Sequence, residues 1–163
     1  MTKGLTVQQS GSAKAWRVDA PEEADYAHWR KLYQGYADFY RREMPDANAE
    51  RVWSWIMDPD HEVNGLLVRD EDGVPVGLAH YRPFARPLTA TTGGFLDDLF
   101  VDPRLRGTGA VDALFDALRQ ITAERGWSVL RWITMDDNYR ARGKYDQVAQ
   151  QTKWVTYDMA PPA

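Results

Sequence analysis

Cysteine is absent from the 163 residues, histidine occurs only three times, and no long apolar run is present. Without cysteine the chain cannot form a disulfide, a thiolate nucleophile or a cysteine zinc site. His28, His61 and His80 do not pair at a short metal-ligand spacing, so we expect no metal site. No apolar stretch approaches the roughly 20 residues of a membrane span or forms a signal peptide, which predicts a cytoplasmic protein with no membrane partner.

The charge and the length narrow the class of protein further. A net charge of −4 argues against a nucleic-acid partner, because phosphate binding needs a concentrated basic face, and it suits a cationic small substrate. The length is that of about one domain. We expect residues 1–13, which are small and polar without a period, to be a disordered lead-in, and residues 14–160 to form the domain.

Signals for strands and helices alternate along this domain. They predict early hairpins and a late strand–helix–strand crossover, which together indicate a single α/β domain with mixed strand pairing. The expected elements, in order, are a strand at 16–18, a helix opened by Pro21, a helix at 47–57, strands at 66–68 and 76–79, a loop at 85–94, a strand at 95–101, a helix from 110 to 126, a strand at 127–135, a helix at 138–149 and a strand at 154–159.

The first expected helix carries an aromatic stripe. Its members recur at spacings of 3, 4, 3 and 4, which places them on one helix face: Tyr26, Trp29, Tyr33, Tyr36 and Tyr40. Such a stripe is first of all a core-packing feature. Its C-terminal members, Tyr36 and Tyr40, are also candidates for the border of a substrate pocket.

A glycine-rich segment, RGTGAV (106–111), joins the 95–101 strand to the next helix. Its glycines let backbone N–H groups approach an anion at the positive start of the helix, and Arg106 adds a charged donor. The segment lacks the lysine of a nucleotide P-loop, and Asp112 occupies the third glycine position of a dinucleotide fingerprint. It fits an acyl-CoA signature, Arg/Gln-x-x-Gly-x-Gly/Ala, except that Val111 stands at the last position. A tight strand-to-helix turn without a ligand is the alternative.

A second motif follows about 30 residues downstream. Asn138, Ala141 and Tyr145 lie at spacings of 3 and 7, on one face of a helix. Ala141 is small enough for an extended ligand arm to lie against the helix, Asn138 can hydrogen-bond that arm, and Tyr145 presents a phenol. Gly143 weakens the helix interior. An ordinary half-buried aromatic is the alternative role for Tyr145.

Together the two motifs resemble the GCN5-related N-acetyltransferase (GNAT) superfamily. The second fits its Asn-x-x-Ala-x-x-x-Tyr signature, although residues 148–150 replace the usual Leu-Gly-Phe. The resemblance implies acetyl-CoA as acyl donor, a homodimer, and a mixed, mostly antiparallel sheet with a bulged fourth strand and flanking helices. It also implies Tyr145 as general acid toward the leaving thiolate. The donor-binding residues that it implies are Leu99, Phe100, Val101, Arg106, Gly107, Thr108, Gly109, Ala110, Val111, Asn138 and Ala141.

Two carboxylates, Asp97 and Asp98, interrupt the apolar strand FLDDLFV (95–101). A buried carboxylate needs partners, and neighbouring strand residues face opposite sides unless a bulge intervenes. The stretch is similar to Tyr-Leu-Glu-Asp-Phe-Phe-Val of diamine and polyamine acetyltransferases, the relatives closest in motif. That resemblance implies a bulge whose freed amides at Leu99 and Phe100 hold the thioester carbonyl, with Asp97 as the base.

The expected acceptor is the primary amine of a small molecule, which arrives charged. An amine of pKa near 10.4 is neutral in about 1 in 2,500 molecules at pH 7, a cost of about 4.6 kcal/mol, and a nearby carboxylate can relay its proton. Asp98, with Tyr36, Tyr40 and Tyr81, is the candidate acceptor-binding set. The alternatives are two purely structural aspartates, a silent acyl-CoA-binding module, and an interaction domain whose aromatic stripe docks a protein.

Overall fold

The computed structural model describes residues 15–162, which divide into two units, one ending at Trp132 and one beginning at Ile133. The expected lead-in at 1–13 lies outside the described residues. The first unit contains a five-stranded sheet in the order β1-β2-β3-β4-β5. All neighbouring pairs are antiparallel except β4 and β5, which confirms the mixed, mostly antiparallel sheet. The strands are β1 (Arg17–Asp19), β2 (Asn64–Arg69), β3 (Pro75–Arg86), β4 (Thr91–Val101) and β5 (Leu130–Arg131).

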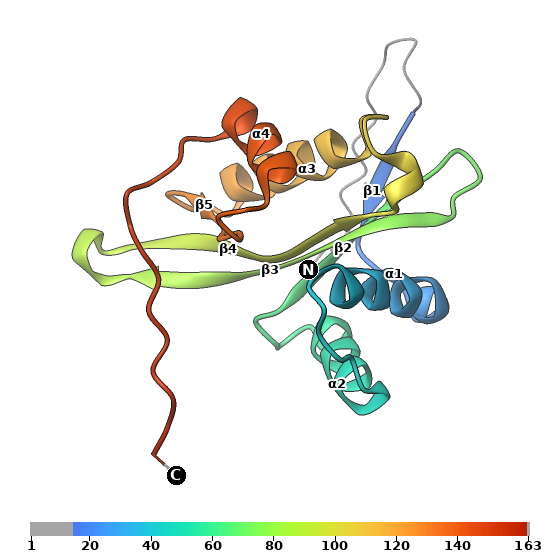
Figure 1. The fold of residues 1–163 in the computed structure, drawn as a ribbon, viewed down its shortest axis with the longest axis horizontal. Coiled ribbons are helices and arrows are strands. Elements are labelled where there is room, and N and C mark those ends of the chain that lie inside the picture. Colours follow the sequence, from blue (N-terminus) through green and yellow to red (C-terminus); the bar gives the residue numbers. More distant parts are fainter. Residues whose placement is uncertain (1–14, 163) are drawn as a thin grey trace. The chain divides into compact units, whose positions relative to one another are not determined.

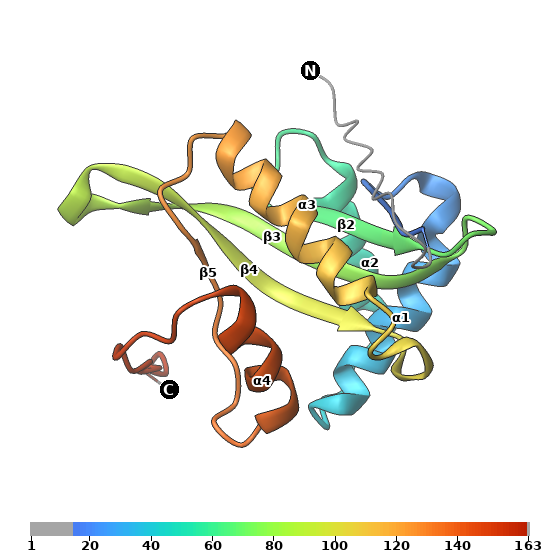
Figure 2. The same cartoon turned by 90° about the horizontal axis from the view of Figure 1, so that it is seen from above.

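Helices cover both faces of this sheet (Figure 1). α1 (Tyr26–Phe39) and α2 (Asp46–Met57) lie on one face, and α3 (Ala110–Glu124) crosses the other, as the view from above shows (Figure 2). The apolar stripe of α3 includes Leu114 and Leu118, both fully buried, and burial of one such side chain stabilises the fold by about 1.5–3 kcal/mol. The core beneath α1 and α2 consists of Trp29, Leu32, Tyr33, Ala49, Ile56, Leu67 and Leu78.

A buried ion pair fixes the start of α1 against the sheet. The helix expected at Pro21 begins as a 3-10 turn at Glu23–Asp25 before α1. The Arg69 guanidinium donates to both carboxylate oxygens of Asp25 at 2.8 and 2.7 Å. These bonds hold the pKa of Asp25 below its usual value. The position of the aromatic stripe over the sheet therefore depends partly on this pair.

β4 contains the bulge that the family resemblance implies. His80 on β3 pairs with Asp98, but the next residue of β3, Tyr81, pairs with Leu96. Asp97 is therefore an extra residue in β4, and the local alternation of side chains changes there.

The loop expected at 85–94 is wrong, because β3 and β4 continue as one long hairpin (Figure 1). Pairing extends to Arg86 and Thr91, and the connection is a short 3-10 turn at Pro87–Thr89. The glycines that suggested a loop are strand residues over which rings pack. A Cβ on Gly94 would lie 2.3 Å from the Trp127 ring.

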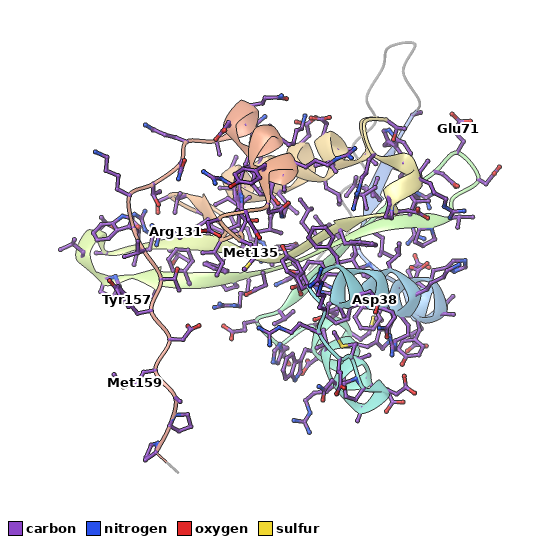
Figure 3. The ribbon with its side chains drawn as sticks, in the orientation of Figure 1. Asp38, Glu71, Arg131, Met135, Tyr157 and Met159 are labelled. Carbon is purple, nitrogen blue, oxygen red and sulfur yellow. The ribbon has the colours of Figure 1, made fainter. Side chains whose placement is uncertain are left out.

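Two other expected strands are also corrected. The strand expected at 127–135 is only two residues long, because β5 pairs with β4 only at Gly94 and Phe95. The strand expected at 154–159 is absent from the described residues. Tyr157 and Met159, labelled in Figure 3, are 89% and 96% exposed. High β-propensity makes no strand where the backbone has no ladder partner.

The second unit contains α4 (Tyr139–Val148), in good agreement with the helix expected at 138–149. Gly143 does not interrupt it. Asn138 occupies the N-cap position, and its carbonyl accepts the first helical bond from the Arg142 amide at 3.0 Å.

Candidate active site

The bulge brings both carboxylates to the sheet face that α1 covers. Asp98 Oδ2 lies 2.8 Å from His80 Nδ1 and accepts from the Tyr33 hydroxyl at 3.4 Å. Arg82 lies two residues after His80 on β3 and therefore faces the same side. Its Nε donates to both oxygens of Asp97, at 3.3 and 3.1 Å. The two aspartates thus share one face but have different partners.

His80 is a site residue that the sequence analysis missed. It is 2% exposed, and its Nε2 accepts a hydrogen bond from the Trp29 indole nitrogen at 2.9 Å. The available signal was a histidine inside the apolar strand VGLAHY (76–81), because a buried polar residue requires partners. Its partners lie 51 residues before it and 18 after it, so no local pattern could identify them.

The carboxylates differ in acidity. Burial acts to raise the pKa of Asp98, but hydrogen bonds from His80, Tyr36 and Tyr33 outweigh it and hold that pKa below its usual value. Burial raises the pKa of Asp97 above its usual value; Arg82 opposes this effect and the charge of Asp98 adds to it. Asp97 is therefore the better proton acceptor of the two.

The aromatic stripe of α1 is divided between the core and the partly exposed surface beside the two aspartates. Trp29 and Tyr33 are buried in the core, whereas Tyr36 and Tyr40 are half-buried. The Tyr36 hydroxyl lies 3.4 Å from the carbonyl oxygen of Asp97, and the Tyr36 and Tyr40 ring centroids are 5.1 Å apart. Burial, followed by the charge of Asp98, raises the pKa of Tyr36, which keeps its phenol a hydrogen-bond donor.

Tyr81 does not join the acidic pair. It follows His80 on β3, so its side chain faces the α3 side of the sheet. It is 4% exposed, and its ring packs 6.2 Å from the Trp127 ring centroid. It lines a cavity of about 220 Å³ together with Ile121 and Arg125 of the α3 side.

The glycine segment forms an open helix start. Gly107 has φ +78° and Gly109, the N-cap of α3, has φ +96°, both in the left-handed region that favours glycine. Apart from Gly107 itself and its two chain neighbours, no described residue has an atom within 4 Å of the place where a Cβ of Gly107 would be. The first helical hydrogen bond of α3 runs from the Ala113 amide to the Gly109 carbonyl, at 3.0 Å. The amides of α3 that precede Ala113 therefore have no intrahelical acceptor.

A hydrogen bond from Trp16 anchors the glycine segment at the start of α3. The Trp16 indole nitrogen donates to the Thr108 carbonyl at 3.0 Å. Arg104 pairs with Asp102 at 2.6 Å, while Arg106 is exposed. Amides that precede the helical hydrogen-bond ladder, glycines that admit a close approach and an exposed guanidinium fit a pyrophosphate. The residues present therefore fit the nucleotide end of coenzyme A.

The outer edge of β4 next to this helix start is mostly unpaired. β4 pairs with β5 only at Gly94 and Phe95, so among the described strands nothing pairs with the outer edge of β4 from the bulge to Val101. The part of β4 that contains Leu99 and Phe100 therefore has backbone groups available to a ligand.

In the second unit, α4 keeps Asn138, Ala141 and Tyr145 in register on one face. The Asn138 amide donates to the Thr134 hydroxyl at 3.2 Å, and Tyr145 is half-buried. Within the described part of the chain, no cluster of three or more histidine or acidic residues could hold a metal ion. The described helices also include none that is long and apolar enough to cross a bilayer.

A mixed sheet with an unpaired strand edge beside a glycine-opened helix start fits the class of proteins that the two motifs resemble, which bind a nucleotide-bearing acyl donor. The model of the acetyltransferase (GNAT) family matches residues 29–149. The chain belongs to this family and is an acetyl-CoA-dependent N-acetyltransferase.

Similar proteins and structures agree with this assignment. The D-amino-acid N-acetyltransferase HPA3 of Saccharomyces cerevisiae is 30% identical over 141 residues, which are 86% of this chain and 88% of HPA3. The uncharacterized N-acetyltransferase YhfO of Bacillus subtilis is 28% identical, over 86% of this chain and 94% of YhfO. A ribosomal-protein-alanine N-acetyltransferase from Brucella melitensis superposes with a TM-score of 0.71 at 26% identity, covering 90% of this chain and 99% of that one. The aminoglycoside N-acetyltransferase AAC(6')-Iy, solved with CoA, shares the fold with a TM-score of 0.78 at 17% identity, over 93% of this chain and 99% of its own.

Proposed function

We propose that the enzyme transfers the acetyl group to a primary amine of a small cationic acceptor, of the diamine or polyamine type, by direct attack in a ternary complex. The observation that supports this proposal is the pair of carboxylates that the bulge brings to one face, beside the half-buried rings of Tyr36 and Tyr40. Carboxylates attract an ammonium group, and aromatic faces stabilise it further. Asp98, Tyr36 and Tyr40 are the proposed acceptor-binding residues.

Asp97 is the proposed base. Its raised pKa lies closer to the working pH than that of an ordinary carboxylate, which favours proton transfer from the ammonium. Its short side chain makes a relay through water the expected route. The neutral amine then attacks the acetyl carbonyl, whose oxygen the Leu99 and Phe100 amides hold, and Tyr145 gives its proton to the leaving thiolate.

The donor-binding residues are proposed from the two motifs and from the open helix start. Coenzyme A supplies the activated thioester; the chain holds its pyrophosphate at the start of α3. The motif of α4 is proposed to hold the pantetheine arm. The proposed set is Leu99, Phe100, Val101, Arg106, Gly107, Thr108, Gly109, Ala110, Val111, Asn138 and Ala141.

The variant Asp97→Asn tests the base. We expect kcat/KM for the amine to fall by about 10²-fold, because general base catalysis contributes about that much. The wild-type profile should lose rate as pH falls through the raised pKa of Asp97, and the variant should lose this limb. Thiol release measured from pH 5 to 9 checks both, and an unchanged profile would remove Asp97 from this role.

The thermal stability of Asp97→Asn serves as the control for this test. A carboxyl group whose pKa is raised by folding contributes its full stabilisation of the fold at pH values below its unfolded-state pKa. That stabilisation is lost as the pH rises through its folded-state pKa. Ionised Asp97 therefore disfavours folding at neutral pH, and Asp97→Asn should not lower Tm. A rate loss with unchanged Tm is then a loss of chemistry.

An amino acid is the second candidate acceptor, and Arg82 favours it. Its contact with Asp97 uses only Nε, and no hydrogen bond within residues 15–162 involves its two terminal nitrogens. A guanidinium with two free parallel donors fits a carboxylate. HPA3, at 30% identity, is a D-amino-acid N-acetyltransferase by name.

Arg82→Lys separates the two acceptors, because lysine keeps the charge beside Asp97 but loses the planar fork. For an amino-acid acceptor we expect KM to rise about 10-fold or more, the effect of a lost charge-assisted hydrogen bond. KM for the matching amine without the carboxylate should change less than about 2-fold. Thiol release with paired acceptors measures this, and equal changes for both would exclude carboxylate recognition by Arg82.

We also propose that the enzyme is a homodimer, as the resemblance implies, and that it is cytoplasmic. Light scattering coupled to gel filtration tests the dimer directly.

A further inference from the structure

The two aspartates of the acceptor site differ in what neutralises them. Asp97 faces a permanent cation, because the Arg82 guanidinium is 3.1 Å from its carboxylate. Asp98 faces the imidazole of His80 at 2.8 Å and the phenol of Tyr33 at 3.4 Å. Whether the site keeps a net negative charge for an ammonium therefore depends on the protonation state of one histidine.

The hydrogen-bond partners of His80 determine that state. An indole nitrogen can only donate, so the Trp29 indole 2.9 Å away requires His80 Nε2 to be an unprotonated acceptor. A histidine with unprotonated Nε2 carries its hydrogen on Nδ1. That hydrogen points to Asp98, so the imidazole is neutral and donates to the carboxylate.

The groups around the His80 imidazole restrict its orientation. Trp29 is fully buried and His80 is 2% exposed. The Tyr33 ring stands edge-on to the imidazole with centroids 4.9 Å apart, and the centroid of the tilted Trp29 ring lies 5.8 Å from that of the imidazole. The indole and phenol come from α1 and the carboxylate from β4, so two elements fix the orientation of an imidazole carried by β3.

We infer that Trp29 and His80 are positioning residues for acceptor recognition: the indole fixes the neutral Nδ1–H tautomer of His80, which orients Asp98 and leaves its negative charge uncompensated for the acceptor ammonium. Asp97 is the compensated carboxylate that handles the proton, and Asp98 is the anchor. This inference deepens the proposed function, because it assigns the charge that selects a cation. It requires that the acceptor bind as an ammonium rather than as a neutral amine.

Nitrogen NMR of the wild-type enzyme, labelled at histidine, tests the tautomer without any acceptor. Only His28, His61 and His80 contribute signals, and single variants of His28 and His61 assign them. We expect the His80 Nε2 shift to be that of an unprotonated nitrogen and its Nδ1 shift that of a protonated one between pH 6 and 8. A protonated Nε2 in this range would overturn the inference, and it would leave the acetyltransferase proposal unaffected.

The variant Trp29→Phe tests the consequence. It frees Nε2, which can then take a proton and compensate Asp98. The groups that face this imidazole are Asp98 from β4 and Tyr33 from α1, with Asp97 and Tyr36 beyond them. We expect KM for the amine to rise about 10-fold at pH 6 and much less at pH 8, with KM for acetyl-CoA unchanged and kcat within about 3-fold.

Matched variants separate positioning from packing. Trp53→Phe removes the indole whose ring centroid lies 4.9 Å from that of Trp29, and it leaves His80 untouched, so it should show no pH-dependent rise in KM. His80→Asn keeps a donor near the Nδ1 position and should retain more amine affinity than His80→Leu. Equal pH-dependent losses in Trp29→Phe and Trp53→Phe, or equal losses in the two His80 variants, would overturn the positioning role. A wild-type enzyme without acceptor-dependent thiol release would instead refute the proposed function.

Discussion

Gly107→Asp is expected to weaken acetyl-CoA binding by about 100-fold or more. A Cβ at this position points into open space, so the new carboxylate projects into the region where the pyrophosphate is proposed to lie. One unit charge at roughly 5 Å from another costs about 3 kcal/mol at an effective dielectric constant of about 20. Titration calorimetry with acetyl-CoA measures the loss as a change in Kd.

Gly126→Asp is the matched control, because Gly126 also has a left-handed φ, +63° against +78° at Gly107. A Cβ there likewise meets no atom of the described residues within 4 Å. Both variants introduce the same charge and a similar backbone strain, but Gly126 follows the C-terminal end of α3. Intact affinity in Gly107→Asp, or equal losses in both variants, would contradict the anion site at the start of α3.

The features that could be predicted from sequence are those that local chemistry determines. The glycine pair at 107 and 109 permits the left-handed backbone that the structure has, and Ala110 begins α3 as expected. The bulge was expected because the strand around Asp97 and Asp98 resembles that of related acetyltransferases, and the structure contains it at Asp97. In each case residues within a few positions carried the signal.

The features that could not be predicted depend on partners distant in sequence. Asp98 is held by His80 and Tyr33, the latter 65 residues away, and nothing near Asp98 identifies either. The hairpin was read as a loop because Gly93 and Gly94 are turn residues by composition. In the structure these glycines make room for the rings of Phe84 and Trp127, a requirement that only tertiary packing reveals.

Residues outside the motifs also decide how the chemistry is divided between the two carboxylates. Arg82 and His80 lie on the same face of β3, two residues apart, and each faces one aspartate of the bulge. In the inference above, the charged partner leaves Asp97 compensated and the neutral partner leaves Asp98 as an anion. The proposed roles of the two acids, base and anchor, therefore depend on a single extra residue in β4.

Tyr145→Phe is expected to lower kcat by about 10²-fold, or about 2.7 kcal/mol in the barrier, if the phenol protonates the leaving thiolate. KM for both substrates should stay within about 3-fold, because phenylalanine keeps the ring and removes only the hydroxyl. Tyr139→Phe is the matched control: it makes the same change on α4, at a residue that is 75% exposed. Thiol release at saturating acetyl-CoA measures kcat for both variants. A rate for Tyr145→Phe equal to that of Tyr139→Phe would remove Tyr145 from the chemistry and leave the leaving thiolate to be protonated by water.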